Sequence, residues 1–463
     1  MINNSTTTVM DKHSVNGKKI TIIGAARSGV AAAELLQSHG AKVFVTDNAV
    51  EEKLSPQIKR LASLGIGFET GGHTPRMYDA DLIVISPGVP SNTPAVREAE
   101  KNGKRIVSEL EIASWFCNSP IIGITGTNGK TTTTSLIGRL LHDAKRKHVV
   151  AGNIGNAFSG VIPEMDTETI AVLEVSSFQL DYIESFHPKV SVFLNLTPDH
   201  LDRYNGLVEN YIAAKCRIFE NQSMNDYLIY NYDDDDVREN VRRMASLHVR
   251  TLGFGIDQQF KEGAFVEDNK LVTLIGGKRS EIIDTEAISI KGIHNLYNAM
   301  ASALTAQVMG VQVPSIRATL NNFKAPPHRL EFVREYKGVK YINDSKATNV
   351  SSVWYALQAY SEPIILLLGG RDKGNDYSKL YDLVRKKVKA VVAIGESANI
   401  VVDEFKDKTK VVRVQSMNEA VDAASSLAAP GDIVMLSPAC ASFDWFKNYE
   451  HRGDVFKQLV NEL

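Results

Sequence analysis

An apolar segment that runs into a glycine-broken turn, followed by a helix opening on Lys-Thr, constrains the fold of this chain most. It occupies residues 121–133 and reads IIGITGTNGKTTT. Glycines let the backbone N–H groups of such a turn point inward at an anion, and the N-terminus of the next helix adds partial positive charge. Lys130 can reach terminal phosphates, and the Thr131 hydroxyl can bind Mg²⁺. The segment therefore predicts an α/β domain that uses a nucleoside triphosphate.

This turn departs from the strict phosphate-loop pattern G-x-x-x-x-G-K-[ST]. Position 124 is Ile, and Gly123 lies one residue too far upstream. A Gly/Thr-rich surface turn is the structural alternative. The agreement of strand, turn and helix favours a variant phosphate loop.

Length and composition limit the class of protein. A chain of 463 residues predicts about three domains, and 43% hydrophobic residues suffice for ordinary cores. The longest apolar runs, such as 364–368 and 388–394, are far shorter than the roughly 20 residues that span a bilayer. Residues 1–16 are polar and lack the apolar core of a signal peptide, so we expect a disordered tail. The spacing of the three cysteines is typical of neither disulfides nor zinc, which favours a cytoplasmic protein.

Charge gives no sign of a polyanionic partner. The net charge is −2, and Lys, Arg, Asp and Glu are evenly mixed, so we expect no nucleic-acid surface. The acidic run at 233–236 lacks the glycine and distal glutamate of a calcium loop, and predicts a solvated loop.

The first α/β segment has the order of a dinucleotide-binding fold. A strand at 19–24, a glycine turn, a helix at 30–39 and a strand at 41–46 ending in Asp47 follow one another, so a dehydrogenase must be considered. However, Ala26 replaces the middle glycine that lets a pyrophosphate approach. The turn Ser86-Pro87-Gly88 follows a buried strand at 82–85, and we expect a nucleotide other than NAD.

The second segment places ligand-type side chains at strand ends. Glu174 lies in the strand-like stretch 169–177, and His200 follows the strand 190–196. Carboxylate and imidazole groups at neighbouring strand ends converge on the edge where the phosphate loop lies, which favours metal binding. Lys215 follows small residues in a helix and is either solvated or closely packed. Asn295 begins a helix that also carries Asn298, and these amides either bind a base or cap the helix.

The third segment begins after the break Pro326-Pro327-His328-Arg329. Strands are expected at 339–342, 363–368, 390–394 and 432–436. Polar clusters follow three of them, at 343–349, 369–374 and 437–442. Lys373 is either solvated or a ligand-binding cation at the end of its strand.

Three of these motifs carry a family resemblance. TGTNGKT at 125–131, GIHN at 292–295 and His328-Arg329 resemble the signatures of the Mur ligases, which share them with relatives of folylpolyglutamate synthetase. Within the family, NDSKATN at 343–349 and LSPACASFD at 436–444 are similar to the members that add D-glutamate to UDP-N-acetylmuramoyl-L-alanine. Another Mur-type ligase with a different amino acid acceptor is the alternative.

The resemblance runs from about residue 19 to the end and implies a three-domain α/β fold. After a tail at 1–18, it implies a Rossmann-like domain for the UDP substrate at 19–109 and a central P-loop ATPase-type domain at 110–325. A C-terminal Rossmann-like domain at 326–463 would bind the amino acid and close on ATP. We expect a monomer whose domains close on substrate.

The family pattern also implies site residues. The Thr131 hydroxyl and the Glu174 carboxylate would bind one Mg²⁺. His200 and Lys215 would bind a second. The resemblance implies that CO₂ carbamylates Lys215, which turns a repelling ammonium into an oxygen ligand. The implied ATP site consists of Gly126, Thr127, Asn128, Gly129, Lys130, Thr131, Thr132, Asn295, Arg329 and Asp344. The implied catalytic residues are Lys130, Glu174, His200, Lys215 and Lys346.

Two further groups of residues would bind the substrates. Asp47, Asn48, Ser86 and Gly88 would face the uridine nucleotide, and Asn153 the muramoyl-alanine portion. D-Glutamate would meet Thr348, Lys373, Ser442 and Tyr449, the last at a position where phenylalanine is commoner.

The implied reaction is ATP-dependent amide formation through an acyl phosphate. Catalysis would be mostly positioning and charge neutralisation. Three other classes stay open from the residues: a P-loop kinase or NTPase without ligation, a non-enzymatic nucleotide-binding module, and a dehydrogenase.

Overall fold

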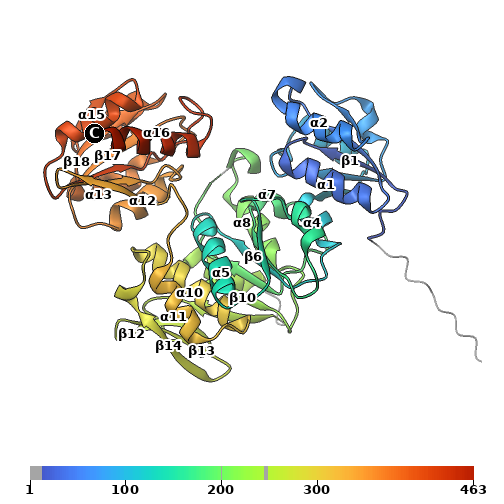
Figure 1. Ribbon diagram of the computed structural model, residues 1–463, viewed down its shortest axis with the longest axis horizontal. Coiled ribbons are helices and arrows are strands. Elements are labelled where there is room, and N and C mark those ends of the chain that lie inside the picture. Colours follow the sequence, from blue (N-terminus) through green and yellow to red (C-terminus); the bar gives the residue numbers. More distant parts are fainter. Residues whose placement is uncertain (1–12, 200, 245–248) are drawn as a thin grey trace, which may run out of the picture. The chain divides into compact units, whose positions relative to one another are not determined.

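Helices and strands alternate along most of the chain in a computed structural model, which describes residues 13–199, 201–244 and 249–463 (Figure 1). The described chain divides into two compact units. The first comprises the described residues up to Lys130, with Leu140–Phe254 and Leu304–Val311; the second comprises Thr131–Arg139, Gly255–Ala303 and Gln312–Leu463. Among the described helices, none is both long and apolar enough to cross a bilayer.

The first unit begins with a five-stranded parallel sheet. Its elements are β1 (Lys19–Ile23), α1 (Arg27–Ser38), β2 (Lys42–Thr46), α2 (Ser55–Ser63), β3 (Gly67–Glu69), β4 (Leu82–Ile85), α3 (Pro94–Lys101), β5 (Ile106–Ser108) and α4 (Glu109–Ser114). The strand order is β3-β2-β1-β4-β5. Alternate residues of β4 belong to different cores: Val84 to one cluster and Ile83 to another. Both faces of the sheet are therefore buried, which explains the unbroken apolar runs of its strands.

The first unit also contains a parallel sheet that carries the phosphate loop. Its elements, with the helix that follows the loop, are β6 (Ile121–Thr125), α5 (Lys130–Asp143), β7 (His148–Gly152), α6 (Phe158–Val161), β8 (Ile170–Glu174), α7 (Ser177–Leu180), β9 (Val190–Phe193), α8 (Val208–Cys216), β10 (Tyr227–Asn231), α9 (Asp235–Met244) and β11 (Arg250–Phe254). The order of these strands is β11-β10-β9-β6-β8-β7. Ile124 is level with Glu174 of β8, and Thr125 with Phe193 of β9. The loops that follow all three strands therefore leave the same edge of the sheet.

The second unit contains two β-hairpins that the sequence did not predict. The elements are β12 (Gly263–Glu267), β13 (Lys270–Ile275), β14 (Lys278–Asp284), α10 (Ile293–Val308) and α11 (Val313–Asn322). The strands pair antiparallel through two-residue turns. Both residues of each turn have positive φ, 49° and 61° at Asp268 and Asn269, and 57° and 74° at Gly276 and Gly277. Such turns match the twist of hairpin strands.

A six-stranded sheet completes the second unit. Its elements are β15 (Glu331–Tyr336), β16 (Val339–Asn343), α12 (Val350–Gln358), β17 (Ile364–Gly369), α13 (Tyr381–Lys387), β18 (Val388–Ile394), α14 (Ala398–Phe405), β19 (Lys410–Arg413), α15 (Met417–Leu427), β20 (Ile433–Leu436) and α16 (Tyr449–Glu462). The order is β15-β16-β20-β17-β18-β19, with only the edge pair β15–β16 antiparallel within this sheet. Leu366 and Leu367 lie in different cores, so this sheet too is buried on both faces.

Candidate active site

The phosphate loop connects β6 to α5 and depends on two glycines. Gly126 and Gly129 have φ of +146° and +83°. A Cβ at Gly126 would lie 3.0 Å from the Cβ of Leu194 and 3.2 Å from the backbone nitrogen of Asn195. A side chain is therefore disfavoured at Gly126 by conformation and by space, and at Gly129 by conformation. This is the close-packed turn that a phosphate-binding loop requires.

Asn195, in the loop after β9, braces the phosphate loop. Its Oδ1 accepts from the backbone N–H of Asn128 at 2.8 Å, and its Nδ2 donates to the carbonyl of the same residue at 3.0 Å. The Asn195 carbonyl accepts from the N–H of Thr127 at 3.0 Å. The Thr127 hydroxyl donates to the carbonyl of Thr197 at 2.9 Å. The backbone of the loop is thus held by the neighbouring strand end.

Two lysines donate to one carbonyl oxygen of the loop. The Nζ atoms of Lys130 and Lys215 each lie 2.8 Å from the oxygen of Gly126, and Lys130 also donates to the carbonyl of Thr127 at 2.7 Å. Lys215, on α8, is only 2% exposed. Burial, and then the nearby charge of Lys130, hold the pKa of Lys215 well below its ordinary value. Lys215 is therefore the packed lysine, not the solvated one.

Glu174 ends β8 beside this pair of lysines. It is 2% exposed, and its charge acts on Lys215 together with that of Asp199. The side-chain nitrogen of Asn153 donates to Glu174 Oε1 at 3.0 Å. A Cβ at Gly152 would lie 2.3 Å from the Glu174 carbonyl oxygen, so a glycine is needed for this approach. The first unit thus brings Lys130, Lys215, Glu174 and Asn153 together, whereas His200 lies outside the described residues.

The second unit holds the residues expected around the nucleoside. Arg329 donates to the hydroxyl of Thr131 at 3.2 Å. Asn295 is buried on α10; it donates to the carbonyl of Lys291 at 2.8 Å and accepts from Asn298 at 3.1 Å. These bonds tie the first turn of α10 to Lys291, which precedes it, and to itself, whereas a helix cap would accept from a backbone N–H.

Asp344 follows β16 and is 7% exposed. The Ser437 hydroxyl donates to its Oδ2 at 2.8 Å, and the Leu330 N–H donates to its Oδ1 at 3.2 Å. Burial raises the pKa of Asp344 to about 7 against these hydrogen bonds and the charge of Arg329. Asp344 thus joins Leu330, just before β15, to the loop after β20.

The residues expected to meet the amino acid all lie in the second unit. Ser442 is buried, whereas Lys373 is exposed. Tyr449 begins α16, and the Lys346 ammonium lies 4.9 Å from the centroid of its ring. The backbone N–H of Thr348 donates to the carbonyl of Lys346 at 2.9 Å.

The expected uridine residues follow β2 and β4. Asp47 accepts from the N–H of Ala25 at 2.6 Å and from that of Ala49 at 2.7 Å, while Asn48 is exposed. The Ser86 hydroxyl donates to the carbonyl of Gly24 at 3.0 Å. The Asp47 carboxylate and the Ser86 hydroxyl therefore stabilise the loops at the strand ends.

Comparison with known proteins identifies the family. The description "Mur ligase middle domain" matches residues 124–306, "Mur ligase, glutamate ligase domain" matches 328–440, and "Mur ligase MurD-like, N-terminal domain" matches 18–108. A protein of Salinibacter ruber named UDP-N-acetylmuramoylalanine--D-glutamate ligase is 46% identical, over 98% of this chain and 100% of its own length. This chain belongs to the Mur ligase family.

Further likenesses agree with the fold of a Mur ligase. A Chloroherpeton thalassium protein with the same printed name is 44% identical over 98% of this chain and 100% of its own length. The crystal structure of UDP-N-acetylmuramate-alanine ligase from Thermotoga maritima aligns with a TM-score of 0.61 and 18% identity, covering 96% of this chain and 99% of that one. The expected three-domain α/β fold and membership of the family are therefore confirmed, and the chain is an ATP-dependent ligase.

Sequence reasoning missed several residues that organise this Mur ligase. Asn195 braces the phosphate loop, as described above. Arg203 donates to the carbonyls of Pro87 and Gly88 at 3.2 and 3.3 Å. Arg452 is 1% exposed and donates to the carbonyls of Cys440 and Ser345 at 3.1 and 2.7 Å. These contacts join distant loops, and no local pattern marks them.

The donor chemistry of the site suits Mg²⁺ in part. The buried Glu174 carboxylate and the Thr131 hydroxyl are hard oxygen donors of the kind that Mg²⁺ prefers. No cluster of three or more His, Cys, Asp or Glu with metal-binding arrangement occurs in residues 13–199, 201–244 and 249–463. A magnesium site in this Mur ligase would therefore combine the Glu174 carboxylate with donors of other kinds, such as the Thr131 hydroxyl.

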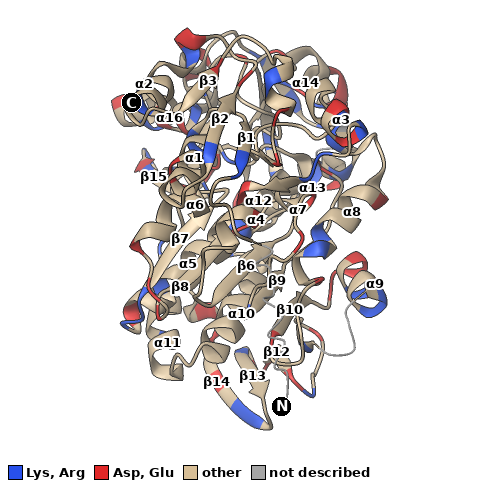
Figure 2. Ribbon diagram, turned by 90° about the vertical axis from the view of Figure 1, so that its right-hand side faces the viewer, with Lys and Arg blue, Asp and Glu red and all other residues tan. Residues whose placement is uncertain are grey.

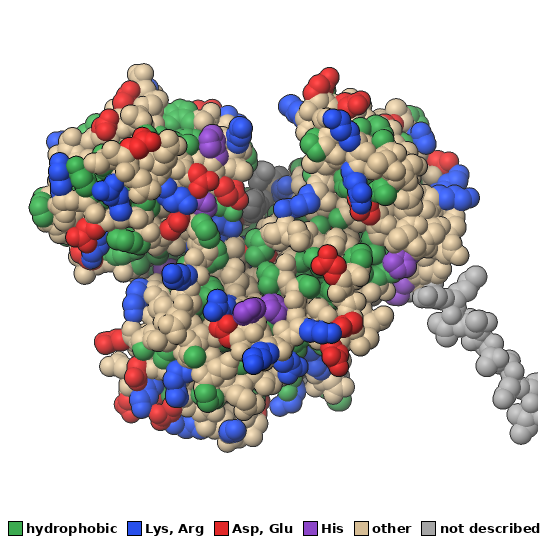
Figure 3. All heavy atoms as spheres, in the orientation of Figure 1, with side chains coloured by type: hydrophobic (Ala, Val, Ile, Leu, Met, Phe, Trp, Pro, Cys, Tyr) green, Lys and Arg blue, Asp and Glu red, His purple; other side chains and the backbone are tan. Residues whose placement is uncertain are grey.

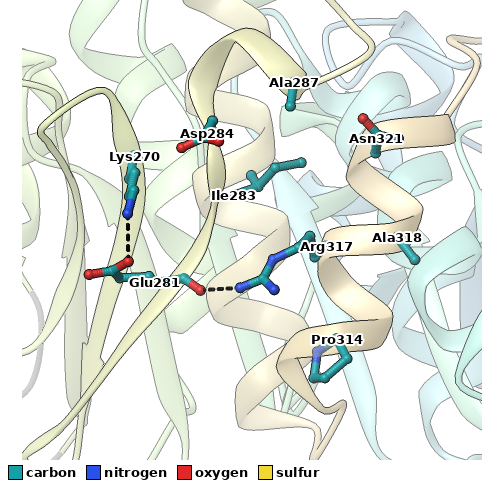
Figure 4. Close-up of a pocket in the computed structure, with 9 residues that line it drawn as sticks. All are labelled: Lys270, Glu281, Ile283, Asp284, Ala287, Pro314, Arg317, Ala318 and Asn321. Carbon is teal, nitrogen blue, oxygen red and sulfur yellow. Dashed lines mark hydrogen bonds and ion pairs between the residues drawn. The ribbon is translucent and has the colours of Figure 1, made fainter.

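A separate hollow of about 530 Å³ lies between β13, β14 and α11 (Figure 4). Its cations already have partners: Lys270 contacts Glu281 at 2.9 Å, and Arg317 donates to the carbonyls of Ile282 and Glu281 at 2.6 and 2.9 Å. Because these charges are satisfied, the hollow has little to offer a phosphate.

Proposed function

We propose that this Mur ligase joins D-glutamate to UDP-N-acetylmuramoyl-L-alanine and converts ATP to ADP and phosphate. The observation that carries the proposal is full-length similarity to relatives named for this reaction, at 46% and 44% identity. The loops at 343–349 and 436–444, which distinguish acceptors within the family, support D-glutamate. The alternative is a Mur-type ligase with another acceptor.

The chemistry proceeds in two displacements. A carboxylate oxygen of the alanyl group attacks the γ-phosphorus of ATP, and the bond to the β–γ bridging oxygen breaks to release ADP. The amine of D-glutamate then attacks the carbonyl carbon of the acyl phosphate and loses a proton. Collapse of the tetrahedral intermediate breaks the C–O bond to phosphate and leaves the amide. Phosphorylation is needed because a free carboxylate is a poor acylating agent.

Residues of the phosphate loop support the first displacement. The Lys130 ammonium rests on the carbonyls of Gly126 and Thr127, and a nucleotide would offer it phosphate oxygens instead. The other proposed ATP residues are Gly126, Thr127, Asn128, Gly129, Thr131, Thr132, Asn295, Arg329 and Asp344. Positioning and charge neutralisation are the main contributions such a site can make.

We propose further that Thr131 and Glu174 bind one Mg²⁺ and that His200 and carbamylated Lys215 bind a second. Bound Mg²⁺ would neutralise phosphate oxygens during transfer. Burial and the Lys130 charge lower the pKa of Lys215, and a neutral amine is the form that attacks CO₂. Addition of the amine nitrogen to the carbon of CO₂, with loss of one proton, gives the carbamate.

The substrate roles are proposed from the family pattern. Asp47, Asn48, Ser86 and Gly88 would bind the uridine nucleotide, and Asn153 the muramoyl-alanine part. Lys346, Thr348, Lys373, Ser442 and Tyr449 would serve the acceptor side. A cytoplasmic monomer is the proposed working form.

Phosphate release by the purified protein tests the proposal. The assay contains ATP, Mg²⁺ and UDP-N-acetylmuramoyl-L-alanine, with D-glutamate compared against L-glutamate, L-alanine and a diamino acid. Release that depends on D-glutamate, together with the product mass of a new amide, is expected. Phosphate release that depends on a different amino acid would show that this amino acid, and not D-glutamate, is the acceptor. Phosphate release that does not depend on any amino acid would contradict ligation.

A further inference from the structure

Backbone pairing joins the two loops proposed to meet the amino acid. The Arg371 N–H donates to the Ala441 carbonyl at 2.9 Å, and the Ala441 N–H returns a bond at 3.1 Å. The Gly369 N–H donates to the carbonyl of Pro438 at 2.9 Å. The approach leaves no room for a side chain, since a Cβ at Gly370 would lie 2.5 Å from the Ala441 oxygen. The loop 369–374, which carries Lys373, and the loop 437–442, which carries Ser442, are therefore held together by backbone hydrogen bonds.

Asp372 closes the turn that carries Lys373. Its Oδ2 accepts from the N–H of Gly374 at 2.7 Å and from that of Asn375 at 3.4 Å. Its Oδ1 accepts from the Tyr377 hydroxyl at 3.2 Å. One carboxylate thus holds both the turn and a buried tyrosine.

A buried hydroxyl and a buried thiol connect this turn to the Ser442 loop. Tyr377 begins the 3₁₀ turn Tyr377–Leu380, and its hydroxyl lies 3.2 Å from the Sγ of Cys440. The Asn375 amide donates to Tyr377 Oη at 3.3 Å, to the Ala439 carbonyl at 3.2 Å and to Cys440 Sγ at 3.4 Å. Ala439 has a φ of +59°, a strained value for a residue with a Cβ. Contacts from the Asn375 amide help to hold that conformation.

The ring of Tyr377 sets where this hydroxyl points. Tyr377 is 2% exposed, and its ring packs edge-on against Phe405 at a centroid distance of 5.9 Å. Tyr381 also packs edge-on against Phe405, at a centroid distance of 5.9 Å. Its hydroxyl, however, bonds Glu404 and has no part in the loops. The chain thus supplies a matched control for the Tyr377 hydroxyl.

We infer that Asp372, Asn375, Tyr377 and Cys440 are positioning residues that hold Lys373 and Ser442 in the arrangement which binds the amino acid acceptor. The inference rests on the proposed function, because it takes these two residues as acceptor contacts. None of the four need touch the substrate. Their effect is to fix the spacing between a cation and a hydroxyl that would bind one small zwitterion.

Tyr377→Phe tests the network by removing one hydroxyl while keeping the packed ring. We expect the KM for the acceptor to rise about 5- to 10-fold, as the loss of a buried hydrogen bond predicts, with kcat and the KM for ATP within about twofold. Tyr381→Phe, which removes the other hydroxyl beside Phe405, is expected to leave all three values unchanged. Equal effects of the two substitutions, or a fall in kcat alone, would overturn the inference.

Hydrogen exchange provides a readout that needs no turnover. In Tyr377→Phe, amides of residues 369–375 are expected to exchange about 5- to 10-fold faster, while those of the Tyr381 helix do not change. If the wild-type protein uses an acceptor other than D-glutamate, its KM is measured for that amino acid. If it uses none, the proposed function fails and exchange alone decides: unchanged protection of 369–375 would refute the network.

Discussion

Two lysine side chains that compete for one carbonyl oxygen define the resting phosphate loop. Lys130 and Lys215 both donate to Gly126, which places two cationic groups about one acceptor in a buried site. Such an arrangement is costly unless one amine is neutral or an anion is added. The lowered pKa of Lys215 favours its neutral amine form. Phosphate near Lys130 and a carbamate on Lys215 would each add an anion.

Removal of the Lys215 amine should therefore be partly reversible from solution. We expect Lys215→Ala to lower kcat by about 10²- to 10³-fold, the range for loss of one charge-stabilising group. Acetate or formate should restore part of the activity, because a small carboxylate can supply the missing oxygen ligand. Initial rates measured against acid concentration check this, with chloride as the control anion. Absence of rescue at every concentration would count against a carbamate.

Asn195 makes a second prediction at this scale. Asn195→Ala removes two hydrogen bonds to the backbone of Asn128, worth about 1 kcal/mol each. We expect kcat/KM for ATP to fall about 30-fold, which corresponds to about 2 kcal/mol. The control is Asn221→Ala, whose amide also makes two hydrogen bonds to backbone atoms, the carbonyls of Glu184 and Phe186, in another loop. A comparable loss of kcat/KM in the control would contradict a specific role for Asn195.

The sequence predicts site residues well only where chemistry is written in a local motif. The phosphate loop is such a case, because glycines and Lys-Thr at fixed spacing have one common use. Asn195 and Arg452 act through hydrogen bonds to backbone atoms 67 and 107 residues away, and Tyr377 acts through the Cys440 thiol, 63 residues away. Asparagine, tyrosine and arginine occur on every surface, so nothing local distinguishes these three. Their roles follow from the packing of loops, which a single sequence does not reveal.

At the scale of elements, buried strands were the easiest to predict. The range expected at 82–85 is the observed β4, and the expected helix 30–39 is α1, which begins earlier at Arg27. The hairpins of β12–β14 were missed because their strands mix charged and apolar residues. Gly276-Gly277 was their available signal, since paired glycines favour hairpin turns.

The acidic run 233–236 shows how an element end can be misjudged. A solvated loop was expected. Asp234 instead accepts from the N–H of Val237 at 2.9 Å at the start of α9. It also accepts from the N–H of Leu196 at 3.0 Å, in the loop after β9. One carboxylate thus caps a helix and anchors the strand-end loop of the proposed site, so the expectation was wrong for Asp234.

A buried carboxyl between two helices gives a prediction at the same scale. Glu109 of α4 is 1% exposed and accepts from the N–H of Ser159, on α6, at 2.7 Å and from its hydroxyl. Burial raises its pKa above the ordinary value of 4.5. Above that pH the folded state keeps a proton that the unfolded state has released, so rising pH favours unfolding.

Glu109→Gln should remove this pH dependence. The amide oxygen still accepts from Ser159, and the neutral side chain has no ionisation cost. Relative to wild type, we expect the variant to gain stability from pH 5 upwards, by at most about 1.4 kcal/mol per pH unit. Urea unfolding at pH 5, 6.5 and 8 measures the gain. A constant difference between the two proteins would contradict the assignment.

Glu111→Gln serves as the contrasting variant. Glu111 accepts from the N–H and hydroxyl of Ser185, the indole of Trp115 and the N–H of Phe186, so both oxygens are needed as acceptors. An amide would turn a donor toward one of these donors. We expect a loss of about 1–3 kcal/mol at every pH.

At the scale of the whole molecule, charge is dispersed. Basic and acidic residues are interspersed along the ribbon, and they mix on the face shown as spheres (Figures 2 and 3). A net charge of −2 on 463 residues agrees with this picture. Attraction of an anionic substrate therefore depends on local groups such as Lys130 and the phosphate loop, rather than on a broad field.

The C-terminal sheet should fold without the rest of the chain. Its two cores consist of residues between 330 and 463, one on each face of the sheet. The core of the N-terminal sheet, by contrast, includes residues beyond 109: Ile112 belongs to it, and Trp115 and Phe116 pack against it. In addition, Leu35 of α1 belongs to the core around the sheet that carries the phosphate loop. Excision of residues 13–109 would therefore expose apolar surface that excision of 326–463 would not.

We expect the fragment 326–463 to be monomeric and to unfold in one cooperative thermal transition, followed by far-UV circular dichroism, because its two cores are formed by its own residues. The fragment 13–109 should bind a hydrophobic dye or aggregate, since Leu35 and the partners of Ile112 would face water. The outcome also tests the expected boundary at 326. If the C-terminal fragment lacked a cooperative transition, its two cores would need contacts from the preceding residues in order to fold.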